Sequence, residues 1–159
     1  RPCTQPPWPV RRGSSGRSSA AASQRCTVPS VPPPAGTLPH RVKRIVCAHD
    51  CGLVINPSGA RNQLEGGLID GLSATLYQGI HIEGGRAVEG NFSEYRMLRM
   101  KEAPAIEIHL VDSDEAPEGL GEMSLPPVAA ALCNAIHAAT GKRIRRLPIN
   151  LLPHNRPTF

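Results

Sequence analysis

Residues 56–78, NPSGARNQLEGGLIDGLSATLYQ, are the stretch around which this 159-residue chain is organised. Asn56 and Pro57 are typical of a helix start, with Asn as the N-cap and Pro in the first turn. Leucine then recurs at every fourth position, which predicts a helix with one apolar face that ends near Gln78: Leu64, Leu68, Leu72 and Leu76. Glycine costs about 1 kcal/mol relative to alanine inside a helix. Three glycines in one helix therefore indicate that another segment or a ligand approaches its backbone closely: Gly66, Gly67 and Gly71.

A second stretch, residues 118–127 (EGLGEMSLPP), places one carboxylate, Glu122, after two closely spaced glycines that can take positive φ values. Two prolines follow and mark the start of a helix, where backbone N–H groups are expected to be unpaired. A general base beside an anion-binding helix end is one interpretation, and a loop glutamate that complements the helix dipole is the other. These residues alone favour the second. The final helix, about 127–140, has Val128, Leu132 and Ile136 on one face and ends at Gly141.

The remaining pattern predicts short strands. Residues 42–49 alternate and form a strand that turns at Gly52, and residues 79–91 read as a β-hairpin with a tight Gly-Gly turn. Residues 91–100 are expected to be extended, and 105–111 form the clearest strand, with His109 on its polar face and without a partner at a useful spacing. Residues 144–152 could add an edge strand. The predicted class is α+β, with two main helices and a small mixed β-sheet.

Charge divides the chain into two unlike parts. The 44 N-terminal residues contain Lys and Arg but no Asp or Glu, whereas the rest is slightly acidic, so the net charge of +5 comes from the head. Residues 1–40, rich in Pro, Ser and Arg, are expected to be disordered. They could bind nucleic acid or an anionic surface, or they could be an out-of-frame translation. The predicted divisions are a head (1–40), a folded domain (41–152) and a tail (153–159).

Five cysteines are an odd number, and their spacing fits no disulfide framework. Cys47 and Cys51 lie on one face of the first strand, which favours core-facing thiols over a metal site, so no metal ligand is predicted. The acidic loop 112–118 lacks the ligand spacing of a calcium loop and is interpreted as a solvated connection. No run of about 18 apolar residues is present, so no membrane span is predicted.

Several short motifs follow one another from about Arg41 to Ile149, with a spacing that resembles one family. It is the molybdenum hydroxylase (xanthine dehydrogenase/aldehyde oxidase) family, and the similarity is to the C-terminal end of its molybdopterin-binding large subunit. The Asn-Phe…Tyr-Arg and Gly-x-Gly-Glu-x-x-x-Pro-Pro versions are most similar to the isoquinoline 1-oxidoreductase β-subunit branch. The motifs are Asp50-Cys51-Gly52, Asn56-Pro57, Gln63-Leu64-Glu65-Gly66-Gly67, Asn91-Phe92, Tyr95-Arg96, Gly119-Leu120-Gly121-Glu122, Pro126-Pro127 and Thr140-Gly141-Lys142-Arg143.

The resemblance implies an oxidoreductase with a molybdenum–pterin cofactor. Such an enzyme hydroxylates a carbon next to nitrogen in an aromatic heterocycle, or an aldehyde carbon, with oxygen from water. It implies that Glu122 is the general base and that Gln63 touches the cofactor. Close approach of the pterin would then explain the glycines of both segments, namely Gly66, Gly67, Gly119 and Gly121.

The family's large subunit is several times longer than this chain and works with an iron–sulfur small subunit or domain. We therefore expect a C-terminal fragment that is inactive in isolation. Substrate and compartment stay open.

One alternative is a small non-catalytic α/β module whose basic head binds nucleic acid or an anionic partner. An aromatic content of 3 % leaves few stacking platforms for bases, which makes nucleic acid an unfavoured partner. A gene product without function is a third interpretation.

Overall fold

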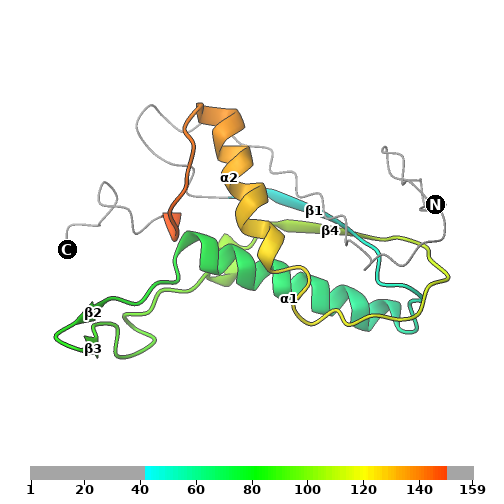
Figure 1. Ribbon diagram of the computed structural model, residues 1–159, viewed down its shortest axis with the longest axis horizontal. Helices are drawn as coiled ribbons and strands as arrows, with labels where there is room; N and C mark the ends of the chain where they lie inside the picture. The colour runs from blue at the N-terminus through cyan, green and yellow to red at the C-terminus, as the bar shows by residue number, and fades with distance from the viewer. Residues whose placement is uncertain (1–41, 150–159) are drawn as a thin grey trace.

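The computed structural model describes residues 42–149, and the predicted head 1–40 and tail 153–159 lie outside this range. The described part has the predicted α+β class, with two main helices and short strands (Figure 1). Its elements, in order, are β1 (Arg44–His49), α1 (Pro57–Leu76), β2 (Ile82–Glu83), β3 (Arg86–Ala87), the 3₁₀ helix η1 (Met100–Glu102), β4 (Ala105–Leu110) and α2 (Pro126–Thr140).

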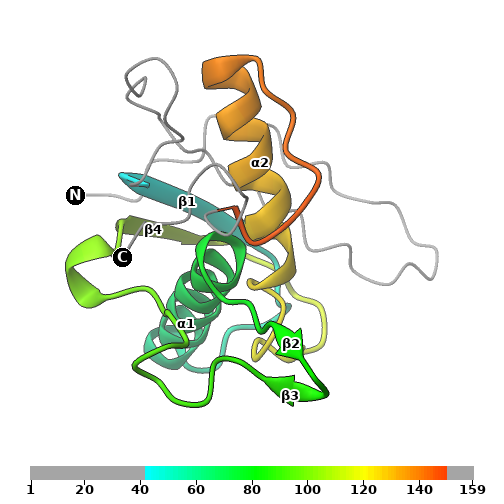
Figure 2. The same cartoon turned by 90° about the vertical axis from the view of Figure 1, so that its left-hand side faces the viewer.

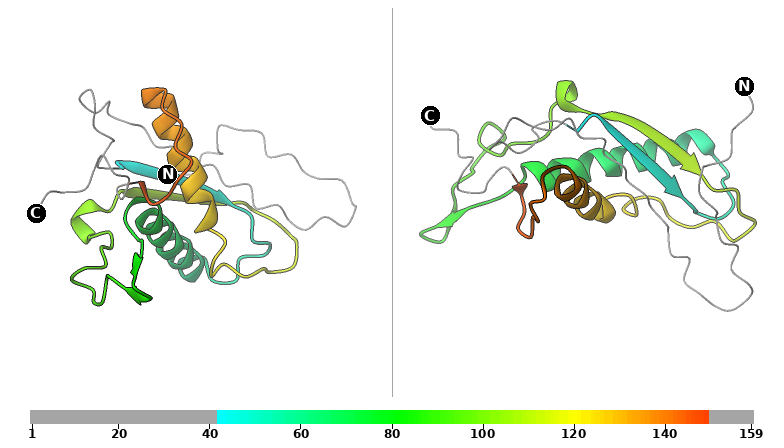
Figure 3. Two further views of the ribbon diagram at one scale, coloured as in Figure 1. Left: turned by 60° about the vertical axis from the view of Figure 1, so that its left-hand side comes forward. Right: turned by 90° about the horizontal axis from the view of Figure 1, so that it is seen from above.

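Strands β1 and β4 form a parallel pair, in register from Arg44 opposite Ala105 to His49 opposite Leu110. A parallel pair needs a long crossover connection, and α1 with the segments that follow it supplies one. Figure 3 shows the two strands side by side, with α1 running along them. The β2–β3 pair is antiparallel and forms a separate two-stranded sheet.

Helix α1 starts and packs as its sequence predicts. The Asn56 side chain accepts a hydrogen bond from the Gly59 N–H at 3.1 Å, which satisfies one free donor of the first turn. Its four leucines are buried. Arg61 Nη1 donates to the Ile108 carbonyl at 2.7 Å, and this bond ties the first turns of α1 to β4.

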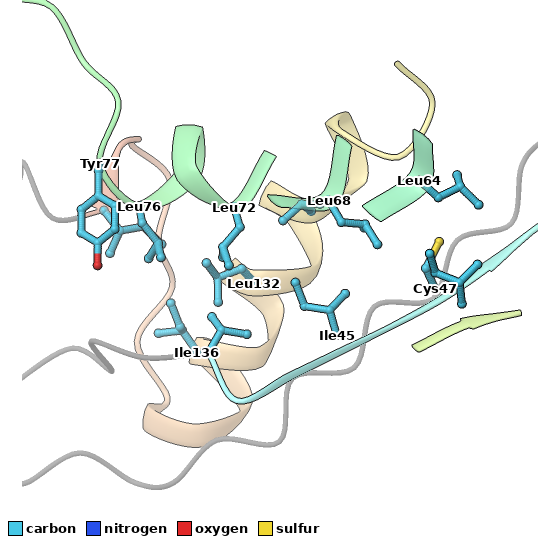
Figure 4. Packing of buried hydrophobic residues seen from close by; sticks show 13 residues of the cluster. Ile45, Cys47, Leu64, Leu68, Leu72, Leu76, Tyr77, Leu132 and Ile136 are labelled. Carbon is cyan, nitrogen blue, oxygen red and sulfur yellow. The ribbon is translucent and has the colours of Figure 1, made fainter. Parts of the chain in front are cut away.

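The apolar core lies between α1, α2 and the β1–β4 pair (Figure 4). From α2, the predicted residues Val128, Leu132 and Ile136 are buried. From the strands come Ile45, Cys47 and Ile108, so at least one of the predicted core-facing thiols packs directly in the core. Cys51 is also buried, just after β1. Helix α2 ends at Gly141, whose φ of 71° is the left-handed conformation expected there.

The β2–β3 hairpin has the predicted Gly-Gly turn. Gly84 and Gly85 have φ values of 56° and 77°, which the two central residues of a type I′ turn require. The hairpin extends away from the helices, as the two perpendicular views in Figures 1 and 2 show.

Three local predictions differ from the structure. Residues 91–95 form turns instead of an extended segment, because Asn91 Oδ1 accepts from the Phe92 N–H at 2.7 Å and Glu94 Oε2 from the Gly90 N–H at 2.8 Å. Within 144–149 no strand is present, and Pro148 has no N–H to give to a ladder. His109 does have a partner, since its Nε2 lies 2.7 Å from Glu107 Oε1 on the same strand.

Strand β1 is also more deeply buried than its predicted alternation implies. All five residues from Ile45 to His49 are buried, so both faces of the strand are covered. Such burial is typical of parallel strands. Neither helix in the described range is long and apolar enough to cross a membrane.

Candidate active site

The loop between β4 and α2 carries Glu122, and its first half pairs with the turn after β1. The Val111 N–H donates to His49 O, the Leu53 N–H to Glu115 O and the Glu118 N–H to Cys51 O, each at 2.9 Å. Gly52 permits this pairing because its φ is 72° and a Cβ there would lie 2.2 Å from Ala116 O. Only glycine fits on both counts.

The second half of the loop packs on α1. A Cβ at Gly67 would lie 2.0 Å from Ser124 Oγ, and one at Gly71 would lie 2.6 Å from Leu125 O. Residues 119–123 therefore connect the turn before α1 with the middle of that helix. Figure 1 shows this path beside α1. The predicted close approach to the α1 backbone is confirmed at Gly67 and Gly71, and it is made by this loop.

Gln63 and Glu122 are both exposed in this region. Gln63 precedes Gly67 by four residues, so it lies on the same helix face, about 6 Å along the axis from the contact with Ser124. Glu122 lies two residues before Ser124, and its carbonyl accepts from the Leu125 N–H at 3.1 Å. The fold thus brings the two predicted site segments to one part of the surface.

The four glycines predicted to contact a cofactor divide into two groups. A Cβ at Gly66, Gly119 or Gly121 would meet no heavy atom within 4 Å, apart from atoms of the neighbouring residues and of the glycine's own helix. A bound group could therefore approach the backbone at these three positions. At Gly67 the space is already filled by Ser124. Gly119 and Gly121 do not have the positive φ values that the sequence suggested.

The start of α2 is a poorer anion site than predicted. Pro126 and Pro127 carry no N–H, the Val128 N–H donates to Leu125 O at 3.3 Å, and no side chain caps the helix. The prediction of several unpaired N–H groups at this helix start is therefore wrong. An anionic group at this place would have to rely on the loop backbone and on side chains.

Burial shifts the pKa values of two side chains at the carboxyl end of β1 toward their neutral forms. Burial lowers the pKa of His49, although the charges of Asp50 and Glu118 oppose the shift. Burial also raises the pKa of the Cys51 thiol, with Asp50 acting in the same direction. The thiolate is the nucleophilic form, so this shift disfavours the reactive form of Cys51.

Residues 42–149 contain no group of three or more His, Cys, Asp or Glu side chains placed to hold a metal ion. The exposed groups that remain are Gln63, Glu122 and the open backbone at Gly66, Gly119 and Gly121. Their accessibility fits one side of a cofactor whose other contacts come from elsewhere.

Comparison with known proteins decides the family of this chain. The model of the molybdopterin cofactor-binding domain matches residues 8–104, more than half of the chain and beginning within its basic head. The chain belongs to the molybdenum hydroxylase family. Its cofactor is a molybdenum–pterin.

Individual relatives agree with this family. The chain is 39 % identical over 108 residues to isoquinoline 1-oxidoreductase subunit beta from Brevundimonas diminuta, covering 68 % of this chain and 14 % of the relative. It is 34 % identical over 115 residues to the xanthine dehydrogenase molybdenum-binding subunit of Escherichia coli, with 68 % and 15 % covered. Quinoline 2-oxidoreductase from Pseudomonas putida shares the fold, with a TM-score of 0.63, 24 % identity, and 69 % of this chain and 15 % of that chain covered.

Two buried residues of this molybdopterin-binding domain, Ser124 and His49, carry no signal in the sequence pattern. Ser124 is fully buried against α1, and His49 is buried at the carboxyl end of β1. No local signal marks either one, because the residues that bury them are distant in the sequence. The glycine excess of α1 was the only hint that a side chain packs there.

Proposed function

We propose that this chain is the part of a molybdenum hydroxylase large subunit that supplies the general base, Glu122. The intact enzyme would hydroxylate a carbon next to nitrogen in an aromatic heterocycle, or an aldehyde carbon, with oxygen from water. The observation that supports this proposal is the packing of Ser124 on Gly67, because Glu122 lies two residues before Ser124 and Gln63 one helical turn before Gly67. The names of the relatives, which act on isoquinoline and quinoline, support the heterocycle.

Each exposed group has a distinct proposed task. The carboxylate of Glu122 takes a proton from the attacking oxygen, for which it must come within about 3 Å. The Gln63 amide can both donate and accept hydrogen bonds, and so it can orient the cofactor. The backbones of Gly66, Gly119 and Gly121 leave room for close approach. When bound, the molybdenum–pterin cofactor supplies the oxidising centre.

We also propose an iron–sulfur small subunit as partner of the intact enzyme. The support is that two relatives are themselves described as subunits. The alternative of a nucleic-acid-binding module is not favoured, because the match to the molybdopterin cofactor-binding domain begins at residue 8, within the basic head, and continues into the folded part.

The proposal is tested by Glu122→Gln in the complete large subunit that contains this segment. Removal of a general base is expected to lower turnover by about 10²- to 10⁴-fold, while the molybdenum content stays unchanged. Steady-state turnover and metal analysis measure the two quantities. Glu115→Gln is the matched control, because Glu115 is an exposed acid of the same loop that binds Leu53 through its backbone carbonyl. Full turnover by the Glu122 variant would refute the assigned role.

A further inference from the structure

Ser124 makes an unusual contact for a polar side chain. It has no exposed surface, and its hydroxyl has no hydrogen-bond partner among the described residues. Burial of an unpaired hydroxyl costs free energy. The hydroxyl presses instead against the α1 backbone, 2.0 Å from the place where a Cβ at Gly67 would lie.

The contact continues one turn further along α1. At Gly71 a Cβ would meet Leu125 O at 2.6 Å and Val128 Cγ2 at 3.1 Å. Gly66, next to Gly67, faces open space. The missing side chains of Gly67 and Gly71 therefore leave a notch in the surface of α1. Ser124 and Leu125 occupy this Gly67–Gly71 notch.

The notch is directly connected to Glu122. The Leu125 N–H donates to the Glu122 carbonyl at 3.1 Å, and the Val128 N–H donates to the Leu125 carbonyl at 3.3 Å. Two prolines between them stiffen the entry into α2. A shift of Ser124 out of the notch would therefore move the backbone of Glu122.

We propose that Ser124 and Gly67 are positioning residues that set the place of Glu122 relative to α1. Gly67 thus acts by receiving the loop, and it does not contact the cofactor. The catalytic consequence rests on the proposed function, whereas the contact itself can be tested in the 159-residue chain.

The test compares four variants of this chain by amide hydrogen exchange. In Gly67→Ala the added methyl meets the Ser124 hydroxyl, so the Leu125 N–H should exchange at least about tenfold faster, with β1 and β4 amides unchanged. Gly66→Ala, the matched control, should leave the exchange of Leu125 unchanged.

The double variant Gly67→Ala with Ser124→Ala should restore the exchange rate of Leu125. It removes the hydroxyl, and the Ser124 Cβ lies an ordinary 3.4 Å from the added methyl. Ser124→Ala alone should fold normally, because it deletes a buried hydroxyl without a partner. The inference is overturned if Gly67→Ala leaves Leu125 protected, or if the double variant is as perturbed as Gly67→Ala.

In the complete large subunit, Gly67→Ala should lower kcat by roughly 10- to 100-fold with KM changed less than about twofold, since a small misplacement of a catalytic group costs that much. Adding Ser124→Ala should restore kcat. Unchanged kcat in Gly67→Ala, in an enzyme that Glu122→Gln inactivates, would overturn the positioning role while leaving the general base in place. The proposed function itself is tested separately, by the turnover of the Glu122→Gln variant.

Discussion

His49 links the sheet to the loop that carries Glu122 through its backbone, while its side chain is buried. It closes β1, its carbonyl accepts from the Val111 N–H, and its side chain is 2 % exposed. Its Nδ1 has no hydrogen-bond partner among the described residues. The neutral imidazole is therefore the form that this environment tolerates, and burial lowers its pKa for that reason.

Acidification should weaken the fold through His49. Its pKa in the folded chain is lower than the unfolded value of about 6.5, so the unfolded state takes up the proton first. The free energy of unfolding should therefore be fully retained above about pH 7 and should decrease as the pH falls below about 6.5. Urea denaturation across this range measures the effect. His49→Gln should flatten this dependence, whereas His137→Gln should retain it. An unchanged slope in the His49 variant would contradict the prediction.

Helix α1 has two faces with different tasks. Its leucines pack against β1 and α2 in the core, and Figure 4 shows Leu68 and Leu72 directed toward Ile45 and Leu132. Its glycine face receives the loop before α2. The helix thus serves both as the main core element and as the surface against which the candidate site is assembled.

The leucine face should dominate stability. Leu68→Ala leaves a cavity among buried residues and should lower the free energy of unfolding by about 2–5 kcal/mol. Glu65→Ala, on the exposed side of the same helix, should change it by no more than about 0.5 kcal/mol. Chemical denaturation of both variants checks the difference. Equal effects would show that the leucine face is not the principal packing surface.

The segment after the hairpin shows why some elements escape sequence-based prediction. Ser73 Oγ accepts from the Leu98 N–H at 2.9 Å, and Arg96 stacks over the Tyr77 ring at 3.9 Å. Arg96 also binds Glu102 Oε1 at 2.9 Å. These contacts anchor a chain without regular hydrogen bonding to the end of α1. The periodicity of residues 91–100 carried no information about them, and the predicted extended segment was wrong where turns form.

The molecule as a whole is a small part of the proteins that it resembles. It spans 14 % of the length of the isoquinoline oxidoreductase subunit. Residues 80–92, which contain the β2–β3 hairpin, expose apolar side chains that an independent domain would normally bury, since Ile80, Ile82 and Phe92 are 60 %, 66 % and 74 % exposed. Such exposure is consistent with an element that packs against other parts of a larger subunit.

The isolated chain should therefore retain little molybdenum. Binding sites usually enclose most of the surface of a ligand, whereas the candidate contacts here are all exposed on one side. We expect metal analysis of the purified chain to give far less than one molybdenum per molecule. The complete large subunit, prepared in the same way, should retain the metal. Stoichiometric molybdenum in the isolated chain would contradict the prediction of an incomplete site.

The amino-acid sequence was sufficient to predict what depends on neighbouring residues. The start of α1 at Asn56 and Pro57, the apolar faces of both helices, the Gly84-Gly85 turn and the end of α2 at Gly141 are all confirmed. Capping, helical periodicity and turn conformation act within one or two turns of chain, so the local residues encode them. The succession of motifs also predicted the family, which the comparisons confirm.

Only the tertiary structure decided which groups meet. The closeness of Gly67 to Ser124 depends on how the whole loop packs between the end of β4 and the start of α2, and no local pattern specifies it. The pairing of His49 with Leu110 likewise joins two strands that are distant in the chain. Glycines in a helix indicated that something approaches the backbone. Packing determined that a serine does so at Gly67, and it thereby holds the loop that carries Glu122 against the middle of α1.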